Sequence, residues 1–489
     1  MRFGGKVTAA LVALSLASCG PDGGGGGSSA PATAGTGGTG GTGGTTSGNG
    51  CSVRERQDWV LAQLREWYLF PETLPTNPNP AAFNSVDAFL DSLTATARGQ
   101  GRDRFFTYIT SIAQENAFNS SGATAGFGFR LINDGSNRVL IAEAFEGAPA
   151  LAAGIDRGAE IIGIGTSTAN VQSVASLINS GGSQAVNDAL GPNTAGTTRV
   201  LRVRDASGTR DVAVTKADFS LIPVSPRYGG IVINDNGRQV GYLNLRTFIP
   251  FADQQLRDAF TRFRSAGITN VIVDFRYNGG GTLNTAELLG DLLGGNRSTS
   301  DVMNVAAFRP EKASNNRTRN FQRQPEAIAP MRLAFIGTPS TASASEEVIN
   351  AFVPYYDRQM ALVGTNTFGK PVGQIGLDRA QCDDRLRVVA FAVQNARGQG
   401  DYFNGLASTV PVSCRAADDL SRPLGDPQEA SIRAALNFLA GQSCAPITAD
   451  AGAGAGLAPQ SANATLFPEN RLVQPERPTP AQREVPGLY

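Results

Sequence analysis

The fold class of this 489-residue chain is decided by the stretch Val271-Ile272-Val273-Asp274-Phe275-Arg276-Tyr277-Asn278-Gly279-Gly280-Gly281. Its first five residues form a short, mostly apolar run of the kind that a buried parallel strand requires. Three consecutive glycines end the stretch, and residues 285–293 then have the character of a helix. A buried strand, a glycine loop and a helix in succession predict an α/β architecture, with a candidate site where the loop leaves the strand.

Two further apolar runs downstream repeat this arrangement. Leu333-Ala334-Phe335-Ile336 runs into the turn Thr341-Ala342-Ser343-Ala344-Ser345-Glu346, and Ala361-Leu362-Val363-Gly364 leads toward Phe368-Gly369-Lys370-Pro371. Upstream, residues 240–266 read as a strand followed by an amphipathic helix. We therefore expect the serine turn and the lysine turn to lie at strand ends of one sheet.

The serine turn has the features of a nucleophile site. The chain contains no histidine, so a Ser-His-Asp triad is impossible and most metal-hydrolase interpretations are weakened. Ser343 precedes a predicted helix, where the N–H of Ala344 and the helix-end partial charge suit a developing oxyanion. Gly279 or Gly280 could supply a second N–H. Ser345 has a simpler interpretation as the helix N-cap, and Ser343 alone could be an ordinary turn residue.

The candidate base, Lys370, needs a special environment. With an ordinary pKa near 10.4, only about one lysine in 2,000 is neutral at pH 7. Acting near neutrality requires a pKa lowered by about 3 units, or about 4 kcal/mol of preference for the neutral amine. Burial among Phe368, Val372 and the glycine turn could supply that desolvation. The alternative is a solvated surface lysine, although its position after a buried strand argues against this.

A second unit is predicted from glycine-rich strand signals. It opens with Gly126-Phe127-Gly128-Phe129 and continues through Gly147-Ala148-Pro149-Ala150 and residues 153–164. These segments resemble a PDZ domain covering residues 116–218. In such domains, N–H groups of a glycine turn hold the terminal carboxylate of a peptide, while a strand edge pairs with the peptide. The resemblance makes the first segment the carboxylate-binding turn, with one of its phenylalanines lining the apolar pocket.

The N-terminus has the composition of an export signal. A basic start precedes the apolar run 7–16, which is too short to span a bilayer. The next segment, Leu16-Ala17-Ser18-Cys19, resembles a bacterial lipobox, which implies a signal peptide at residues 1–18 and lipidation of Cys19. Sorting to the outer membrane, facing the periplasm, is also implied. The alternative is an ordinary secretory signal. Residues 19–50 are small and polar, which predicts a flexible tether.

Cysteine usage fits an exported protein. Four cysteines follow the lipobox, an even number of the kind used for disulfides in an oxidising compartment: Cys51, Cys382, Cys414 and Cys444. Three pairings are possible, and free buried thiols are the alternative. We expect Cys51 to pair with Cys444, since they mark the ends of the ordered chain. Residues 446–489, rich in Ala, Gly and Pro, are predicted to be disordered.

Taken in order, these segments resemble the carboxy-terminal processing peptidases, also called tail-specific proteases. The resemblance covers residues 53–444. It implies a ClpP/crotonase-like core of α/β class at residues 225–445, an inserted or preceding PDZ-like domain, and a small helical region at residues 51–115. It also implies a tethered, extracytoplasmic serine endopeptidase that captures protein substrates by their accessible C-termini and needs no cofactor or metal.

The same resemblance assigns roles within the site. Ser343 is the nucleophile, Lys370 the general base and Gln374 the residue that orients the lysine. Ala344 and either Gly279 or Gly280 complete the oxyanion hole.

Two departures from the family pattern bear on these roles. The serine-to-lysine separation is two residues longer than usual, so counting back from Lys370 would select Ser345. We retain Ser343, because the six-residue turn matches without a gap. The extra residues fall around 353–357, which leaves the role of Asp357 open.

Other functions remain open at this stage. The same fold could serve a non-catalytic lipoprotein that binds peptides or apolar ligands, or an esterase or amidase acting on small molecules. Nothing suggests a nucleic-acid partner, because 42 basic residues balance 42 acidic ones. The oligomeric state is left open.

Overall fold

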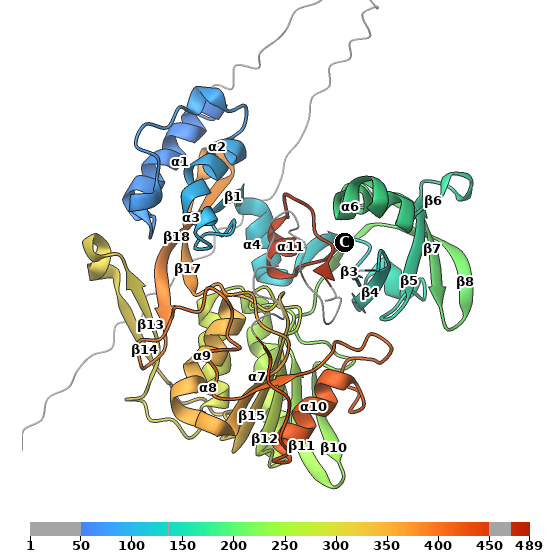
Figure 1. The fold of residues 1–489 in the computed structure, drawn as a ribbon, viewed down its shortest axis with the longest axis vertical. Helices are drawn as coiled ribbons and strands as arrows, with labels where there is room; N and C mark the ends of the chain where they lie inside the picture. Colours follow the sequence, from blue (N-terminus) through green and yellow to red (C-terminus); the bar gives the residue numbers. More distant parts are fainter. Residues whose placement is uncertain (1–49, 135, 449–470) are drawn as a thin grey trace, which may run out of the picture. The chain divides into compact units, whose positions relative to one another are not determined.

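A computed structural model describes residues 50–134, 136–448 and 471–489 of the chain (Figure 1). Its central sheet has six strands in the order β10-β11-β12-β15-β16-β19, and every pair except β10–β11 is parallel. The strands are β10 (Gly230–Asp235), β11 (Arg238–Asn244), β12 (Asn270–Asp274), β15 (Arg332–Gly337), β16 (Met360–Gly364) and β19 (Ser413–Arg415). The α/β architecture predicted from the apolar runs is confirmed, with β12, β15 and β16 formed by those runs.

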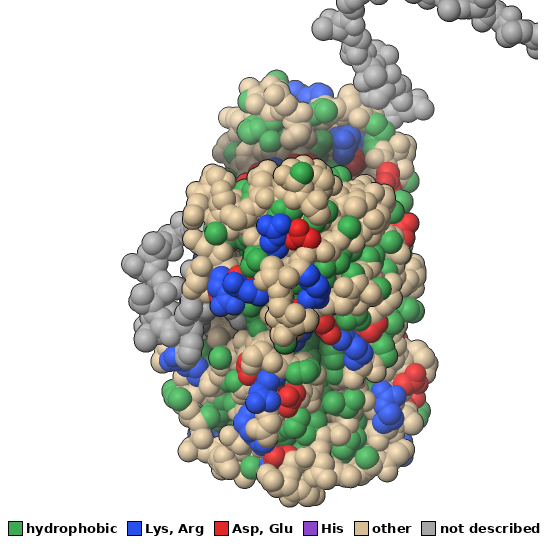
Figure 2. Space-filling model, turned by 90° about the vertical axis from the view of Figure 1, so that its right-hand side faces the viewer, with side chains coloured by type: hydrophobic (Ala, Val, Ile, Leu, Met, Phe, Trp, Pro, Cys, Tyr) green, Lys and Arg blue, Asp and Glu red, His purple; other side chains and the backbone are tan. Residues whose placement is uncertain are grey.

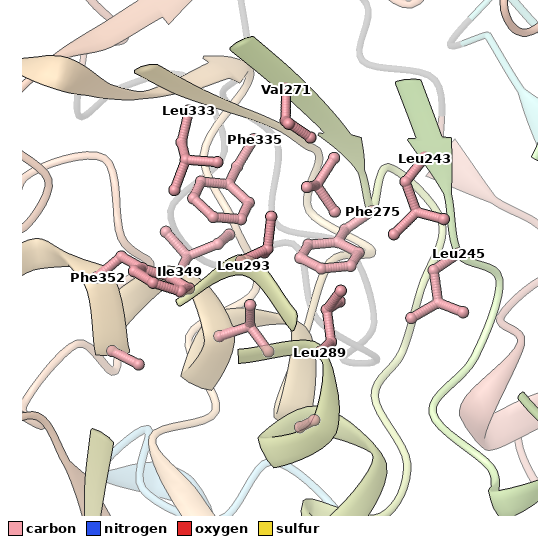
Figure 3. Packing of buried hydrophobic residues seen from close by; sticks show 14 of the residues in the cluster. Leu243, Leu245, Val271, Phe275, Leu289, Leu293, Leu333, Phe335, Ile349 and Phe352 are labelled. Atoms are coloured by element: carbon pink, nitrogen blue, oxygen red, sulfur yellow. The ribbon is translucent and has the colours of Figure 1, made fainter. Parts of the chain in front are cut away.

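Helices cover both faces of this sheet. Successive strand residues point to opposite faces, so Val271 and Val273 of β12 join one buried cluster while Ile272 joins another. The first cluster packs against three helices, α7 (Asp253–Ser265), α8 (Leu283–Leu293) and α9 (Ala344–Tyr356), with Phe275, Phe335 and Phe352 at its centre (Figure 3). The second packs against α10 (Ala430–Leu439). Burial on both faces explains why these strands read as continuous apolar runs.

The predicted N-terminal helical region is confirmed, and it joins a second sheet. Its helices are α1 (Val53–Trp67), α2 (Val86–Leu93), α3 (Ala95–Gly99) and α4 (Ile112–Ser121). The second sheet runs in the order β1-β18-β13-β14, with β17 also paired to β18. Its strands are β1 (Tyr108–Ser111), β13 (Val302–Phe308), β14 (Arg317–Asn320), β17 (Val372–Arg379) and β18 (Asp384–Gln394). The N-terminal helices therefore pack on the strands that follow the lysine turn.

The segment predicted to be a PDZ-like domain forms a β-rich unit at residues 123–220. A seven-stranded sheet runs β20-β3-β4-β5-β7-β8, with β6 on β5 and β20 (Arg471–Leu472) from the C-terminal segment, and a two-stranded ribbon joins β2 to β9. The strands from this unit are β2 (Ala123–Gly126), β3 (Phe129–Asn133), β4 (Val139–Ala144), β5 (Glu160–Gly165), β6 (Gln172–Ser173), β7 (Thr198–Asp205), β8 (Gly208–Thr215) and β9 (Ala217–Ser220). Its helices are α5 (Pro149–Ala152) and α6 (Val174–Leu190), the latter interrupted at Gly181 and Gly182.

The C-terminal segment corrects one prediction. Residues 446–489 were expected to be disordered, but residues 471–489 form strand β20 (Arg471–Leu472) and helix α11 (Pro480–Glu484). Val473, Val485, Leu488 and Tyr489 are almost completely buried. The Ala/Gly/Pro composition of the whole stretch masked these few apolar residues, which bury enough surface to order the chain end. Residues 449–470 lie outside the described ranges.

The disulfide prediction was also wrong. Cys51 pairs with Cys382, their Cα atoms 5.5 Å apart, and Cys414 pairs with Cys444 at 5.3 Å. Cys51 precedes α1, which packs on the second sheet, and Cys382 lies in the turn between β17 and β18. The expectation failed because it used only the positions of the cysteines in the sequence. The pairing depends instead on which sheet each cysteine lies against in the fold.

The predicted signal peptide, Cys19 and the tether at residues 19–50 fall almost wholly outside the described residues. Among the helices of the described ranges, none has the length and apolar character needed to span a bilayer. The face in Figure 2 shows basic and acidic side chains interspersed in small groups. This pattern agrees with the equal numbers of the two charges in the sequence.

Candidate active site

Ser343 occupies a strained turn between β15 and α9. It is the N-cap of α9, with φ 56° and ψ −117°. A positive φ in a residue other than glycine costs about 1–3 kcal/mol, and such residues cluster at functional sites. The side chain of Ser343 is only half-buried. The turn therefore presents a hydroxyl at the start of a helix, where N–H groups point outward.

Ser345 has a different environment from Ser343. It is completely buried, and its hydroxyl donates to the main-chain oxygen of Asn278 at 3.2 Å. Its predicted role as N-cap was wrong, because α9 begins at Ala344 and the cap position belongs to Ser343. The residue instead ties the helix to the glycine loop. Of the two candidate nucleophiles, Ser343 is the accessible one.

The glycine loop packs directly on the serine turn. The main-chain oxygen of Asn278 accepts from Ala342 N–H at 3.0 Å, and its side-chain Oδ1 accepts from Gly280 N–H at 2.9 Å. A Cβ on Gly280 would lie 2.8 Å from Cβ of Ser343, so this approach requires glycine. The N–H of Gly279 is directed at a main-chain oxygen, that of Glu484, at 3.1 Å. Of the two predicted oxyanion donors, the Gly280 N–H thus binds within its own loop, and the Gly279 N–H binds the C-terminal segment.

The Lys370 amine is held in apolar surroundings. Its Nζ donates to Oε1 of Gln374 at 3.1 Å, and Nε2 of Gln374 donates to the main-chain oxygen of Phe106. The Phe106 ring lies 5.2 Å from Nζ and 5.8 Å from the Phe368 ring, centroid to centroid. Burial lowers the pKa of Lys370, while the Glu484 carboxylate acts in the opposite direction. Burial thus acts on Lys370 in the direction that the sequence argument required, and Phe106 is a neighbour that the argument did not anticipate.

Glu346 joins the two turns, and the sequence argument missed it. Its carboxylate accepts four hydrogen bonds: from Ser343 N–H at 3.1 Å, Lys370 N–H at 2.8 Å, Gly369 N–H at 2.7 Å and the Thr367 hydroxyl at 2.6 Å. Burial raises the pKa of Glu346, and these hydrogen bonds oppose the rise. Among the described residues, no hydrogen bond links the Ser343 hydroxyl directly to the Lys370 amine. Glu346 is the connection between nucleophile and base.

Arg104, from the N-terminal region, fixes the lysine turn from the other side. Its Nη2 donates to the main-chain oxygens of Phe368 at 2.7 Å, Gly369 at 2.6 Å and Phe403 at 3.1 Å. Gly369 has φ 88°, and a Cβ there would lie 2.3 Å from the Phe403 oxygen. The lysine turn is therefore built from segments that are far apart in sequence, which no local motif could reveal.

Asp357 lies apart from this site. It is exposed and follows the last residue of α9, at the opposite end of the helix from Ser343. A helix of 13 residues is about 20 Å long, so Asp357 does not reach the Ser343 hydroxyl.

The predicted carboxylate-binding turn lies between β2 and β3. The N–H groups of Gly128 and Phe129 donate to the main-chain oxygen of Tyr489, at 2.7 and 3.3 Å. The rings of Phe127 and Phe129 are buried and stacked, with centroids 5.4 Å apart. Gly126 ends β2, and a Cβ there would lie 2.7 Å from the carbonyl carbon of Tyr489. Two N–H groups of the turn therefore bind the main-chain oxygen of Tyr489.

Comparisons with known proteins were made against this geometry. Residues 239–412 match the family described as "Peptidase family S41", and residues 55–108 match the "Peptidase S41 N-terminal domain". The first range contains the glycine loop, the serine turn and the lysine turn. The second contains Arg104 and Phe106, which contact the lysine turn.

Two curated relatives are named carboxyl-terminal-processing protease. The one from Synechocystis sp. is 25% identical over 323 residues, which are 64% of this chain and 66% of the relative. The one from Picosynechococcus sp. is 26% identical over 254 residues, 51% of this chain and 55% of the relative. The chain thus spans less than two thirds of the length of these relatives.

A solved structure assigned to the S41 proteases, from Bacteroides fragilis, is similar with a TM-score of 0.60 and 25% identity. The match covers 78% of this chain and 97% of that one. The matched domains, the named relatives and the solved structure agree: residues 55–108 and 239–412 match peptidase S41 domains, and the chain is similar to carboxyl-terminal-processing proteases.

Proposed function

We propose that the chain is a serine endopeptidase in which Ser343 is the nucleophile and Lys370 the general base. The observation that carries the proposal is the Glu346 carboxylate, which accepts hydrogen bonds from both turns. It brings a strained, accessible serine and a desolvated lysine into one site. The match of residues 239–412 to peptidase family S41 supports proteolysis as the reaction, and the hydrogen bond from Lys370 to Gln374 supports the proposed orientation of the lysine.

The chemistry is acyl transfer. The neutral amine of Lys370 takes the proton of the Ser343 hydroxyl as its oxygen attacks a peptide carbonyl, and the N–H groups of Gly279 and Ala344 stabilise the oxyanion. The tetrahedral intermediate collapses to an acyl-enzyme, and the protonated amine of Lys370 returns the proton to the leaving amine. A water activated by Lys370 then hydrolyses the ester and restores Ser343. Burial of Lys370 favours the neutral amine that the first step needs.

Substrate capture belongs to the same proposal. We place the catalytic residues on a ClpP/crotonase-like core and the turn at residues 126–129 in a PDZ domain that binds the carboxyl end of a protein substrate. The second assignment is supported by the N–H groups of Gly128 and Phe129, which bind a main-chain oxygen, and by the edge of β3, which pairs with the chain that precedes this oxygen's residue. The substrates are accordingly proteins with accessible, unstructured C-termini.

The location of the protein is likewise proposed. The lipobox at residues 16–19 supports export and attachment through a lipidated Cys19 to the outer membrane, facing the periplasm. The two disulfides support an oxidising compartment.

Cleavage assays with two matched substrates test the proposal. The full chain is incubated with an unstructured protein that has a free C-terminus and with the same protein amidated at that end. We expect faster cleavage of the free form, and loss of cleavage of both forms in Ser343→Ala. Equal rates for the two forms would contradict C-terminal capture. Absence of any cleavage across a broad pH range would favour the non-catalytic binder.

A further inference from the structure

The C-terminal residues of the chain lie in the groove that the proposed function reserves for a substrate. The N–H of Tyr489 donates to the Phe129 oxygen at 2.9 Å, and the N–H of Leu131 donates to the Gly487 oxygen at 3.0 Å. With the Gly128 and Phe129 N–H groups on the Tyr489 oxygen, these bonds form an antiparallel bridge between Leu488 and Arg130 on the edge of β3 that also pairs with β20. This is the mode in which a peptide adds to an exposed strand edge.

The Tyr489 side chain fills the pocket beside the turn. Its exposed fraction is 1%, and it belongs to the same buried cluster as Phe127, Phe129 and Val186 of α6. Its hydroxyl has no hydrogen-bond partner among the described residues. The pocket therefore recognises an apolar or aromatic ring and offers nothing to the hydroxyl.

The same segment also reaches the candidate oxyanion loop. The Glu484 oxygen accepts from Gly279 N–H, and a Cβ on Gly279 would lie 2.5 Å from the Arg483 oxygen. The Arg483 guanidinium lies 3.7 Å from the centroid of the Tyr108 ring. In Figure 1 this segment is red, with α11 beside α4, and Ala481, Val485 and Leu488 share a buried cluster with Phe118 of α4. Residues 483–486 thus cover the N–H that a substrate carbonyl would need.

The peptide bond between Glu484 and Val485 is fixed by hydrogen bonds on both of its sides, as expected for a bound ligand that is not cleaved. The Val485 N–H donates to the Ala481 oxygen at 2.8 Å, and the carbonyl oxygen of the same peptide bond, that of Glu484, accepts from the Gly279 N–H. Among the described residues, no hydrogen bond joins the Ser343 hydroxyl to this segment. Both polar groups of the bond are occupied, and the nucleophile is not bound to it.

We propose that residues 471–489 are an intramolecular inhibitor that occupies the peptide-binding edge of β3 and the oxyanion loop together. The proposal rests on the proposed peptidase function and names the regulation of the same site. A tethered ligand acts at an effective concentration of about millimolar, so a substrate tail must compete with it. The apparent affinity for substrate falls by the fraction of molecules in which the groove is open.

Peptide binding tests the inference without requiring catalysis. The probe is a fluorescently labelled peptide with the sequence of residues 479–489 and a free carboxylate, and its anisotropy is followed in the Ser343→Ala background. Three full chains are compared: the chain ending at Tyr489, its Tyr489→Asp variant, and the chain extended by four Gly/Ser residues after Tyr489. The extension changes no native residue, so it guards against a folding defect in Tyr489→Asp. Thermal unfolding checks all three.

We expect the substituted and extended chains to bind the probe about tenfold or more tightly than the chain ending at Tyr489. Tyr489→Phe is the matched control, and it should bind the probe no more tightly than the parent. In chains that retain Ser343, the same two changes should raise cleavage of an unstructured protein about tenfold or more. Equal probe binding by all chains would overturn the inference, whatever the cleavage rates. If the substituted and extended chains bind the probe more tightly than the parent but no chain cleaves the protein, the inference is supported and the proposed peptidase function is contradicted.

Discussion

The serine turn and the lysine turn are built in different ways. The serine turn is made within the central sheet, where Asn278 of the glycine loop binds Ala342 and Ser345 through its main-chain oxygen. The lysine turn depends on Arg104 and Phe106, which come from the N-terminal region. The comparison teaches that the proposed nucleophile is positioned within the α/β core, whereas the turn of the proposed base also needs residues from the N-terminal region.

The largest expected effect separates the two serines of the first turn. Ser343→Ala should lower the cleavage rate about 10³-fold or more, because it removes the proposed nucleophile. Ser345→Ala should change the rate less than about tenfold and lower the free energy of unfolding by about 1 kcal/mol, since it loses one buried hydrogen bond. Single-turnover kinetics and denaturant unfolding measure the two quantities. The reverse ranking of the rates would assign the nucleophile to Ser345.

The next effect concerns the base. Lys370→Ala should lower the rate about 10²–10⁴-fold. In the parent, the rate should rise with pH as the amine loses its proton. The midpoint should lie below the ordinary lysine value of 10.5, because burial lowers the pKa of Lys370. A pH–rate profile checks this, with a flat profile expected for Lys370→Ala. A parent midpoint at or above 10.5 would show that the base is solvated.

A third effect tests the connection between the turns. Glu346→Gln replaces one of the two acceptor oxygens by an NH2 group, which cannot accept. The hydrogen bonds lost are either those from the Ser343 and Lys370 N–H groups to Oε2 or those from the Gly369 N–H and the Thr367 hydroxyl to Oε1. We expect kcat to fall about 10²-fold with KM nearly unchanged, because the reacting groups are misplaced while substrate binding is not affected. Steady-state kinetics make the distinction. An unchanged kcat would mean that the two turns hold their geometry without Glu346.

The fourth effect concerns stability and leaves activity unchanged. Burial raises the pKa of Glu347 to about 8, and its Oε1 accepts from Asn304 at 2.7 Å. The folded chain therefore retains a proton that the unfolded chain releases near pH 4.5, so stability should fall as pH rises from about 5 to 8. The slope is at most about 1.4 kcal/mol per pH unit. Glu347→Gln should flatten this dependence without changing kcat, as urea unfolding at several pH values can show.

The sheet and the chemistry-bearing turns were predictable because their signals are local. Burial on both faces leaves β12, β15 and β16 as apolar runs, and each run leads toward a turn with an unusual residue, such as Ser343 or Lys370. Burial of the lysine followed from an energetic requirement, since a solvated amine could not act near pH 7.

The remaining features depend on contacts between distant segments. Glu346 already had a local explanation as an acidic residue in a first helical turn, which hid its hydrogen bonds to the lysine turn. Arg104 contacts Gly369 across 265 positions of sequence. The pairing of Cys51 with Cys382 follows from which sheet α1 meets. Order at residues 471–489 comes from a few apolar side chains within a composition typical of disorder.

The backbone of Ser343 has a consequence for how this chain balances activity against robustness. Its φ of 56° suits glycine, which adopts positive φ without the steric cost that any other residue bears. A Ser343→Gly chain would therefore lose its proposed chemistry and gain resistance to unfolding, by as much as about 1 kcal/mol. Selection for folding alone would favour that replacement. A serine at this position therefore costs stability, and in return it supplies the hydroxyl of the proposed chemistry.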